Sequence, residues 1–116
     1  MEMIICDPDK NECHLMESYV HEFYMDKGFH VQVRQCGDWQ ELCSQIRKKG
    51  ADIVIVAQEG VKGLDIMTGL KVSAMKRIWF SDLDFGVQAY RLNVSYFNML
   101  PVTREKIFYA LQNLDL

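Results

Sequence analysis

Short apolar runs alternate along the chain with longer segments in which apolar residues recur every three or four positions. Short runs of this kind predict strands. Residues 53–57 are continuously apolar, which predicts a strand covered on both faces in the middle of a parallel sheet. Residues 29–34 alternate strictly between apolar and polar positions, which predicts a strand with one buried face near a sheet edge. Further strands are expected over residues 3–6, 77–80 and 95–99.

The segments between these runs carry the signals of helix starts and ends. Asp9 with Glu12, and Asp38 with Glu41, form two capping boxes, in which side chains satisfy the free backbone donors of a first turn. Gly28 and Gly50 are expected to end these two helices. Three more helices are expected: one after residue 63, one over 82–92, and one after Pro101 that Thr103 caps. The expected apolar stripes are Leu15, Met16, Tyr19, Val20 and Phe23; Leu42 and Ile46; Leu64, Ile66, Met67, Leu70 and Val72; Phe85, Ala89, Tyr90 and Leu92; and Ile107, Phe108, Leu111 and Leu114.

Five strands that alternate with five helices predict one α/β domain over residues 1–116. The leading topology is a doubly wound, flavodoxin-like parallel sheet in the order 2-1-3-4-5, with helices on both faces. In such a sheet the functional crevice lies at the carboxyl ends of strands one and three. Residues 7–9 and 57–59 occupy those two positions.

Composition narrows the classes of function. The chain has 13 basic and 16 acidic residues and a net charge of −3, which excludes attraction of nucleic acid or anionic membranes by bulk charge. The longest apolar run is too short for a membrane helix, and the first residues lack the pattern of a secretion signal. The four cysteines form no CxxC pair and no zinc spacing, so reduced thiols, no metal site and a cytoplasmic location are expected. The dispersed residues His14, His21 and His30 are expected on the surface.

Two chemistries are common at such a crevice. Binding a nucleotide or flavin phosphate needs a loop rich in glycine or hydroxyl groups after the first strand, whereas residues 7–12 are acidic and have neither. Accepting a phosphoryl group needs a nucleophilic aspartate, acidic ligands for Mg²⁺, a hydroxyl and a lysine.

Two segments in the last third of the chain, residues 85–94 and 96–102, carry a family resemblance. Positions 89, 90, 93 and 97 and the dipeptide at 101–102 are in register with the fourth helix, fifth strand and following turn of LytTR-type regulators. The chain resembles, over essentially its whole length, the receiver (CheY-like) domains of two-component response regulators.

The resemblance implies a degenerate phosphorylation pocket. The phosphoacceptor position falls on Ala57, the acidic pair on Asp7 and Pro8 with Asp9 following, and the conserved lysine on Leu100. The hydroxyl after the fourth strand is kept as Ser81. Glu59 and Asp82 are possible replacement carboxylates, although loop acidity and a helix N-cap explain them equally well. Asp7 is either a residual metal ligand or a solvated or helix-capping carboxylate.

The implied function is that of a pseudo-receiver without enzyme activity or cofactor, which acts by dimerising or docking a partner protein. It would be the N-terminal domain of a LytTR-type regulator, with any DNA contact in an output domain outside this chain. The aromatic switch position falls on Phe97, and Phe97 with Ser81 is either a switch or inherited core packing. Tyr90, Phe108 and Tyr109 are interface candidates. The alternatives are a phosphoacceptor that uses Asp7, and a small-ligand sensor in the pocket beside Ala57 and Leu100.

Overall fold

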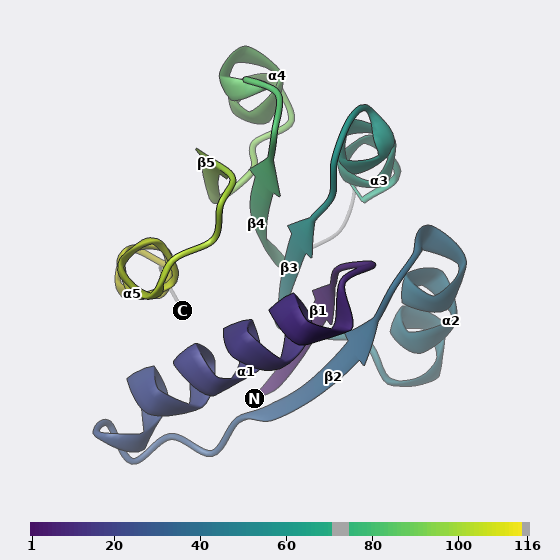
Figure 1. The fold of residues 1–116 in the computed structure, drawn as a ribbon. Coiled ribbons are helices and arrows are strands. Elements are labelled where there is room, and N and C mark those ends of the chain that lie inside the picture. The colour runs from purple at the N-terminus through teal and green to yellow at the C-terminus, as the bar shows by residue number, and fades with distance from the viewer. Residues whose placement is uncertain (71–74, 115–116) are drawn as a thin grey trace.

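The computed structural model describes residues 1–70 and 75–114, and it shows a parallel five-stranded sheet in the order β2-β1-β3-β4-β5 (Figure 1). The strands are β1 (Glu2–Cys6), β2 (Gln32–Cys36), β3 (Ile53–Ala57), β4 (Lys76–Ser81) and β5 (Tyr96–Met99). The helices are α1 (Lys10–Met25), α2 (Trp39–Lys49), α3 (Lys62–Gly69), α4 (Gly86–Arg91) and α5 (Arg104–Gln112). The predicted fold class and strand order are confirmed.

Helices cover both faces of the sheet. Figure 1 shows α1 and α5 on one face and α2, α3 and α4 on the other. Alternate residues of β1 therefore enter different cores: Met3 and Ile5 pack with α1 and α5, whereas Ile4 and Cys6 pack with the other three helices. Every residue of β3 is buried, as expected for a central strand.

Strand β2 lies at the sheet edge as predicted, but the predicted bounds of 29–34 are wrong. The parallel register pairs Glu2 with Gln32 and Cys6 with Cys36. Because β1 begins at Glu2, residues 29–31 have no strand beside them to pair with. The start of β2 is therefore set by where the neighbouring strand β1 begins. The alternation of apolar and polar residues in β2 itself does not indicate this.

Three local expectations about helices are also corrected. The side chain of Leu15 was expected on the buried stripe of α1, but it is 47% exposed. Helix α4 has six residues and begins at Gly86, not at residue 82. Asp82 does not cap a helix, because its Oδ1 accepts a hydrogen bond from the Gly60 N–H at 2.8 Å. Val72, expected on the stripe of α3, lies outside the described residues.

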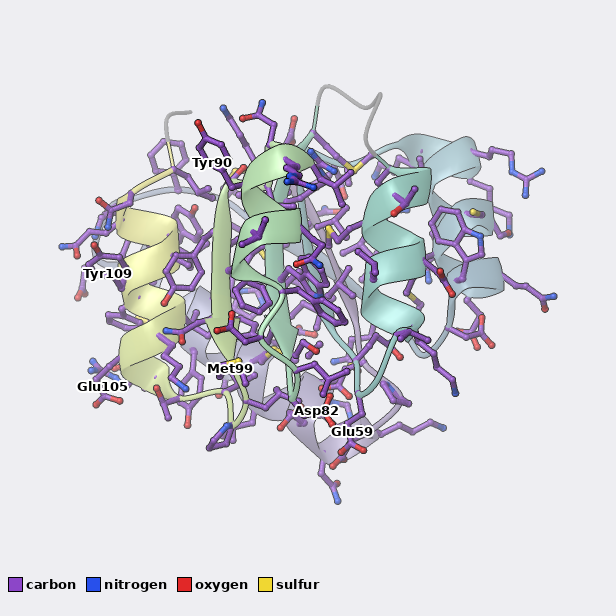
Figure 2. All side chains as sticks on the ribbon, turned by 90° about the horizontal axis from the view of Figure 1, so that it is seen from above. Glu59, Asp82, Tyr90, Met99, Glu105 and Tyr109 are labelled. Carbon is purple, nitrogen blue, oxygen red and sulfur yellow. The ribbon has the colours of Figure 1, made fainter. Side chains whose placement is uncertain are left out.

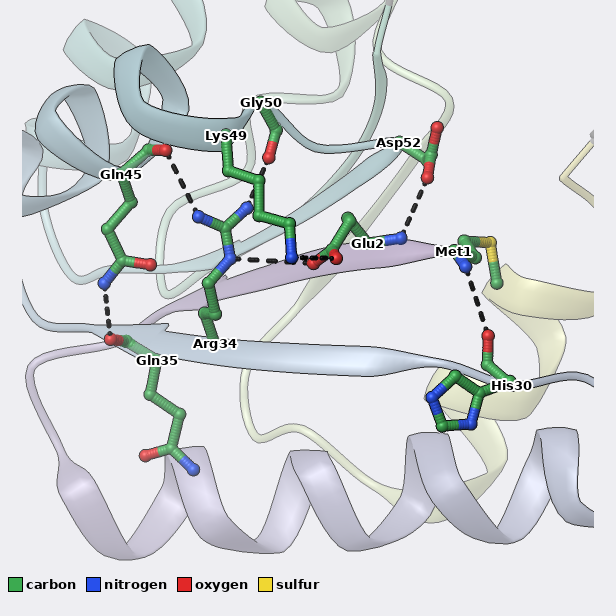
Figure 3. A network of polar contacts seen from close by, with 9 residues as sticks. All are labelled: Met1, Glu2, His30, Arg34, Gln35, Gln45, Lys49, Gly50 and Asp52. Atoms are coloured by element: carbon green, nitrogen blue, oxygen red, sulfur yellow. Dashed lines mark hydrogen bonds and ion pairs between the residues drawn. The ribbon is translucent and has the colours of Figure 1, made fainter.

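Polar contacts tie the elements together at the amino ends of the strands (Figure 3). The guanidinium of Arg34 on β2 donates to the carbonyls of Gln45 and Gly50 at the end of α2. Lys49 pairs with Glu2 at 2.9 Å, and the Glu2 N–H donates to Asp52 Oδ2 at 2.8 Å. The candidate site lies at the opposite end of the strands, where their carboxyl ends meet.

Candidate functional site

A pocket of about 670 Å³ opens at the carboxyl ends of the strands. Its walls come from the segments that follow β1, β3, β4 and β5, and Figure 2 labels Glu59, Asp82 and Met99 along this edge. The lining residues are Asp7, Pro8, Asp9, Glu12, Ala57, Gln58, Glu59, Lys62, Asp82, Leu100 and Pro101.

The structure brings together five of the six predicted pocket residues: Asp7, Pro8, Asp9, Ala57 and Leu100. Ser81 is fully buried at the end of β4 and is not part of the lining. Its Oγ accepts a hydrogen bond from the Leu83 N–H at 3.1 Å, and its carbonyl accepts one from the Leu100 N–H at 2.8 Å. Ser81 therefore shapes the loop after β4.

The sequence places residues 57–59, including Gln58, at the crevice, but it did not place Glu12, Lys62 or Pro101 in the pocket. Pro101 directly follows a predicted pocket residue, so chain adjacency could have indicated it. Lys62 begins α3, and Glu12 lies in the first turn of α1. The sequence assigned Glu12 only to a capping box with Asp9, and only half of that box forms. Asp9 Oδ1 accepts hydrogen bonds from the Asn11 and Glu12 N–H groups, as expected. The Asp9 N–H, however, donates to Asp7 Oδ1 at 2.8 Å and not to the Glu12 side chain. The Glu12 carboxylate therefore remains available at the pocket.

Asp7 is the most unusual group of the site. The residue is 4% exposed, and its Oδ2 receives no hydrogen bond from any described residue. The pKa of Asp7 is raised to about 8, mainly because burial penalises the charged carboxylate. The nearby Glu12 carboxylate raises this pKa further because it hydrogen-bonds only to protonated Asp7, and the Asp9 N–H partly opposes the shift.

Two positions on the pocket floor are apolar, and one nearby lysine is engaged elsewhere. Ala57 ends β3, is 1% exposed and belongs to the pocket lining. Leu100 packs against the core and cannot offset negative charge. The ammonium group of Lys106 donates to the carbonyls of Met99 at 2.7 Å and Pro101 at 2.9 Å. Among the described residues Lys62 is the sole basic member of the lining.

The donor set does not favour a metal ion. Within residues 1–70 and 75–114, no group of three or more His, Cys, Asp or Glu side chains is arranged to hold one. All four cysteines are free, and Cys6, Cys13 and Cys36 are buried. The pKa of the Cys13 thiol is raised to about 12, first by burial and then by the charge of Asp7, so this thiol is not poised to bind a cation.

Comparison with solved structures gives the fold its name. A two-component response regulator from Clostridium difficile superposes with a TM-score of 0.77 at 14% identity, over 97% of this chain and 93% of that one. The chain has the receiver fold. A response regulator receiver domain protein from Clostridium thermocellum gives a TM-score of 0.71 at 18% identity, over 97% and 91% of the two chains.

The receiver domain of NtrX from Brucella abortus gives a TM-score of 0.72 at 14% identity, over 95% of this chain and 94% of that one. No family model matches the sequence, and no curated protein matches it either. Across the part of the chain that the structure describes, every helix is too short or too polar to cross a bilayer.

The four switch and interface candidates lie in two different environments of this receiver fold. Tyr90 on α4 is 86% exposed and Tyr109 on α5 is 58% exposed, and β5 lies between these two helices (Figure 2). Phe108 packs edge-on against Phe23 of α1, with ring centroids 5.3 Å apart. Phe97 contacts Trp79 edge-on, with centroids 5.0 Å apart. Tyr90 and Tyr109 can therefore meet a partner, whereas Phe97 and Phe108 pack inside this chain.

Proposed function

We propose that this chain is a phosphorylation-independent regulatory domain with the receiver fold, not an enzyme, which acts in the cytoplasm through a protein interface. The observation that carries the proposal is Ala57 at the carboxyl end of β3, facing the pocket. A methyl group cannot attack phosphorus, and the resemblance to receivers places the phosphoacceptor at this position.

The other pocket residues support the same conclusion. Leu100 offers no positive charge to a transferred phosphoryl group, and the loss of one such electrostatic partner typically costs about 3–4 kcal/mol of transition-state stabilisation. Lys106 is engaged with two backbone carbonyls. Asp7 is a poor substitute nucleophile, because a pKa near 8 keeps most of it protonated at neutral pH.

The proposed output surface is the exposed face formed by α4, β5 and α5. It carries Tyr90, Val87 and Tyr109, which are 86%, 61% and 58% exposed. Exposed aromatic residues beside an edge strand are typical anchors of protein interfaces. The resemblance of residues 85–102 to LytTR-type regulators supports a role as the N-terminal domain of such a transcription factor, with DNA contacts in an output domain outside these residues.

Phosphorylation is tested by incubating the protein with acetyl phosphate and Mg²⁺ and measuring its intact mass, beside an active receiver as positive control. The expected result is no phosphoryl adduct on this chain under conditions that label the control. A stoichiometric adduct would contradict the proposal, and its loss in Asp7→Ala would identify Asp7 as the acceptor.

The interface is tested by sedimentation equilibrium of the wild type and of Tyr90→Ala. If the domain self-associates through this face, Tyr90→Ala weakens the association at least tenfold. Met25→Ala is the matched control, because Met25 is 75% exposed on α1. If the isolated domain is a monomer, the proposed occupant of the face is a different protein.

A further inference from the structure

The pocket combines an acidic wall with an apolar one. Five carboxylates line it, with Lys62 as the sole base among the described residues. Pro8, Ala57, Leu100 and Pro101 supply the apolar surface. A volume of about 670 Å³ is in the range of about 300–1,000 Å³ that is typical of sites for small organic molecules. The carboxylates are Asp7, Asp9, Glu12, Glu59 and Asp82.

Asp7 gives this wall a specific centre. In the ionised form of Asp7, which a bound cation would stabilise, Oδ2 has no donor among the described residues, and the residue is only 4% exposed. A buried carboxylate oxygen without a hydrogen-bond partner is energetically unfavourable, and a bound donor would remove this cost. The adjacent Glu12 carboxylate adds a second acceptor for the same donor group.

Two rim carboxylates are held in place by backbone donors. Asp82 Oδ1 accepts from the Gly60 N–H at 2.8 Å, and Asp9 Oδ1 accepts from the Asn11 N–H at 2.9 Å. These bonds orient the side chains before any ligand binds. A pre-oriented acidic rim attracts cations and repels phosphate and other anions.

We propose that this pocket binds an organic cation, namely an ammonium or guanidinium group carried on a short apolar chain. The cationic group donates to Asp7 Oδ2 and Glu12, and the apolar chain lies on Pro8, Leu100 and Pro101. The inference rests on the proposed function, because it requires a pocket that is not used for phosphoryl transfer. The chemistry is shared by free small amines and by a lysine or arginine side chain of a partner protein.

An organic cation fits the pocket better than a metal ion does. Mg²⁺ requires nearly octahedral oxygen ligands at about 2.0–2.1 Å, and no described group of three acidic, His or Cys side chains converges on one point. The apolar wall would also be left without contacts by a bare ion.

The test is a ¹⁵N–¹H NMR titration of the domain with n-butylammonium chloride, beside 1-butanol as an uncharged probe of similar shape. Saturable shifts are expected at the amides of residues 7–9 and 57–59 with butylammonium, and at least tenfold weaker binding with butanol. Equal responses to the two probes, or no saturable response to butylammonium, would overturn the inference. Saturable shifts at the same amides with MgCl₂ at lower concentration than with butylammonium would overturn it in favour of a metal site.

Substitutions of the pocket carboxylates test where the cation binds. Asp7→Asn keeps the shape of the side chain and is expected to weaken butylammonium binding at least tenfold, and Glu12→Gln gives an independent measurement if Asp7→Asn does not fold. Asp26→Asn is the same substitution on an exposed residue after α1 and is expected to leave binding unchanged. Unchanged binding in both Asp7→Asn and Glu12→Gln would remove the basis of the inference.

The two sources of the cation are separated by replacing butylammonium with 1,5-diaminopentane or with a blocked Gly-Lys-Gly peptide. Tighter binding of the diamine indicates a free ligand, and tighter binding of the peptide indicates a partner side chain. The proposed function fails independently, on the acetyl phosphate measurement, so the two outcomes are distinguishable.

Discussion

The backbone of Gly63 in α3 lies against the indole of Trp79 in β4, so closely that a Cβ at position 63 would lie 2.6 Å from Trp79 Nε1. Trp79 is fully buried and stacks on Phe85, with ring centroids 5.2 Å apart, so the indole cannot move away. Only a residue without a side chain permits this approach of α3 to the sheet. The relationship is steric, because Gly63 does not have a left-handed backbone conformation.

Gly63→Ala is therefore expected to lower the free energy of unfolding by about 1–3 kcal/mol, the usual cost of overpacking a core. Urea unfolding followed by circular dichroism measures it. Gly37→Ala is the control, because a Cβ there would meet no atom closer than 3.9 Å. Equal stabilities of the two variants would show that α3 shifts without cost.

Replacing Arg77 is expected to be more damaging than replacing any exposed arginine. Arg77 is 4% exposed on β4, and its guanidinium donates to the carbonyls of Met67 at the end of α3 and of Leu92 and Asn93 after α4. Arg77→Met leaves these carbonyls without their donor and should lower the free energy of unfolding by about 2–4 kcal/mol. Arg91→Met, on the exposed face of α4, should change it by less than about 0.5 kcal/mol.

Hydrogen exchange separates a local from a global effect of Arg77→Met. Faster exchange confined to residues 92–94, which follow α4, would show that Arg77 mainly fixes the helix end. Stability equal to that of Arg91→Met would show that the guanidinium bonds contribute nothing net.

Asp7 should make the protein less stable as the pH rises. Its pKa is about 8 in the folded protein against an ordinary value of 3.8, so between these values the folded state binds a proton that the unfolded state lacks. Stability from this group is fully present below about pH 4 and is lost as the pH rises through about 8. One proton contributes at most about 1.4 kcal/mol per pH unit.

Asp7→Asn cannot titrate, so the free energy of unfolding of this variant should exceed that of the wild type by an increasing amount between pH 5 and pH 8.5. Urea titrations at several pH values measure the difference, and Asp26→Asn should show no such trend. A difference that does not depend on pH would mean that Asp7 is ionised in the folded protein at neutral pH.

Truncating two aromatic residues on neighbouring elements should affect the stability of the protein very differently. Phe97→Ala removes the ring that contacts Trp79, and the expected loss is about 2–3 kcal/mol in the free energy of unfolding, with a change in Trp79 fluorescence. Tyr90→Ala should change this free energy by less than about 0.5 kcal/mol, because the residue is 86% exposed. A stability loss in Tyr90→Ala as large as in Phe97→Ala would mean that Tyr90 also supports the core.

Local features of the chain were sufficient to predict most of the fold. The apolar run at 53–57 predicts a central strand, and β3 is buried throughout. Asp9, Asp38 and Thr103 were expected at helix starts, and each side chain accepts backbone hydrogen bonds there. These signals act within a few residues, so they are readable without the tertiary structure.

The candidate pocket, too, is only partly predictable from the sequence. Its floor, with Ala57, Pro8 and Leu100, follows from strand ends and from register with a known family, both of which are properties of the sequence. The pairing of Glu12 with Asp7, the engagement of Lys106 with two carbonyls and the clamp made by Arg77 were not predictable. Each depends on where the parallel register and helix packing bring side chains together, and this placement shifts the pKa of Asp7 and leaves its second oxygen without a donor. The sequence by itself determined the architecture, because residue type and local periodicity specify the strands and helices. Only the tertiary structure decided the charge and polarity of the pocket, because burial and long-range contacts control them.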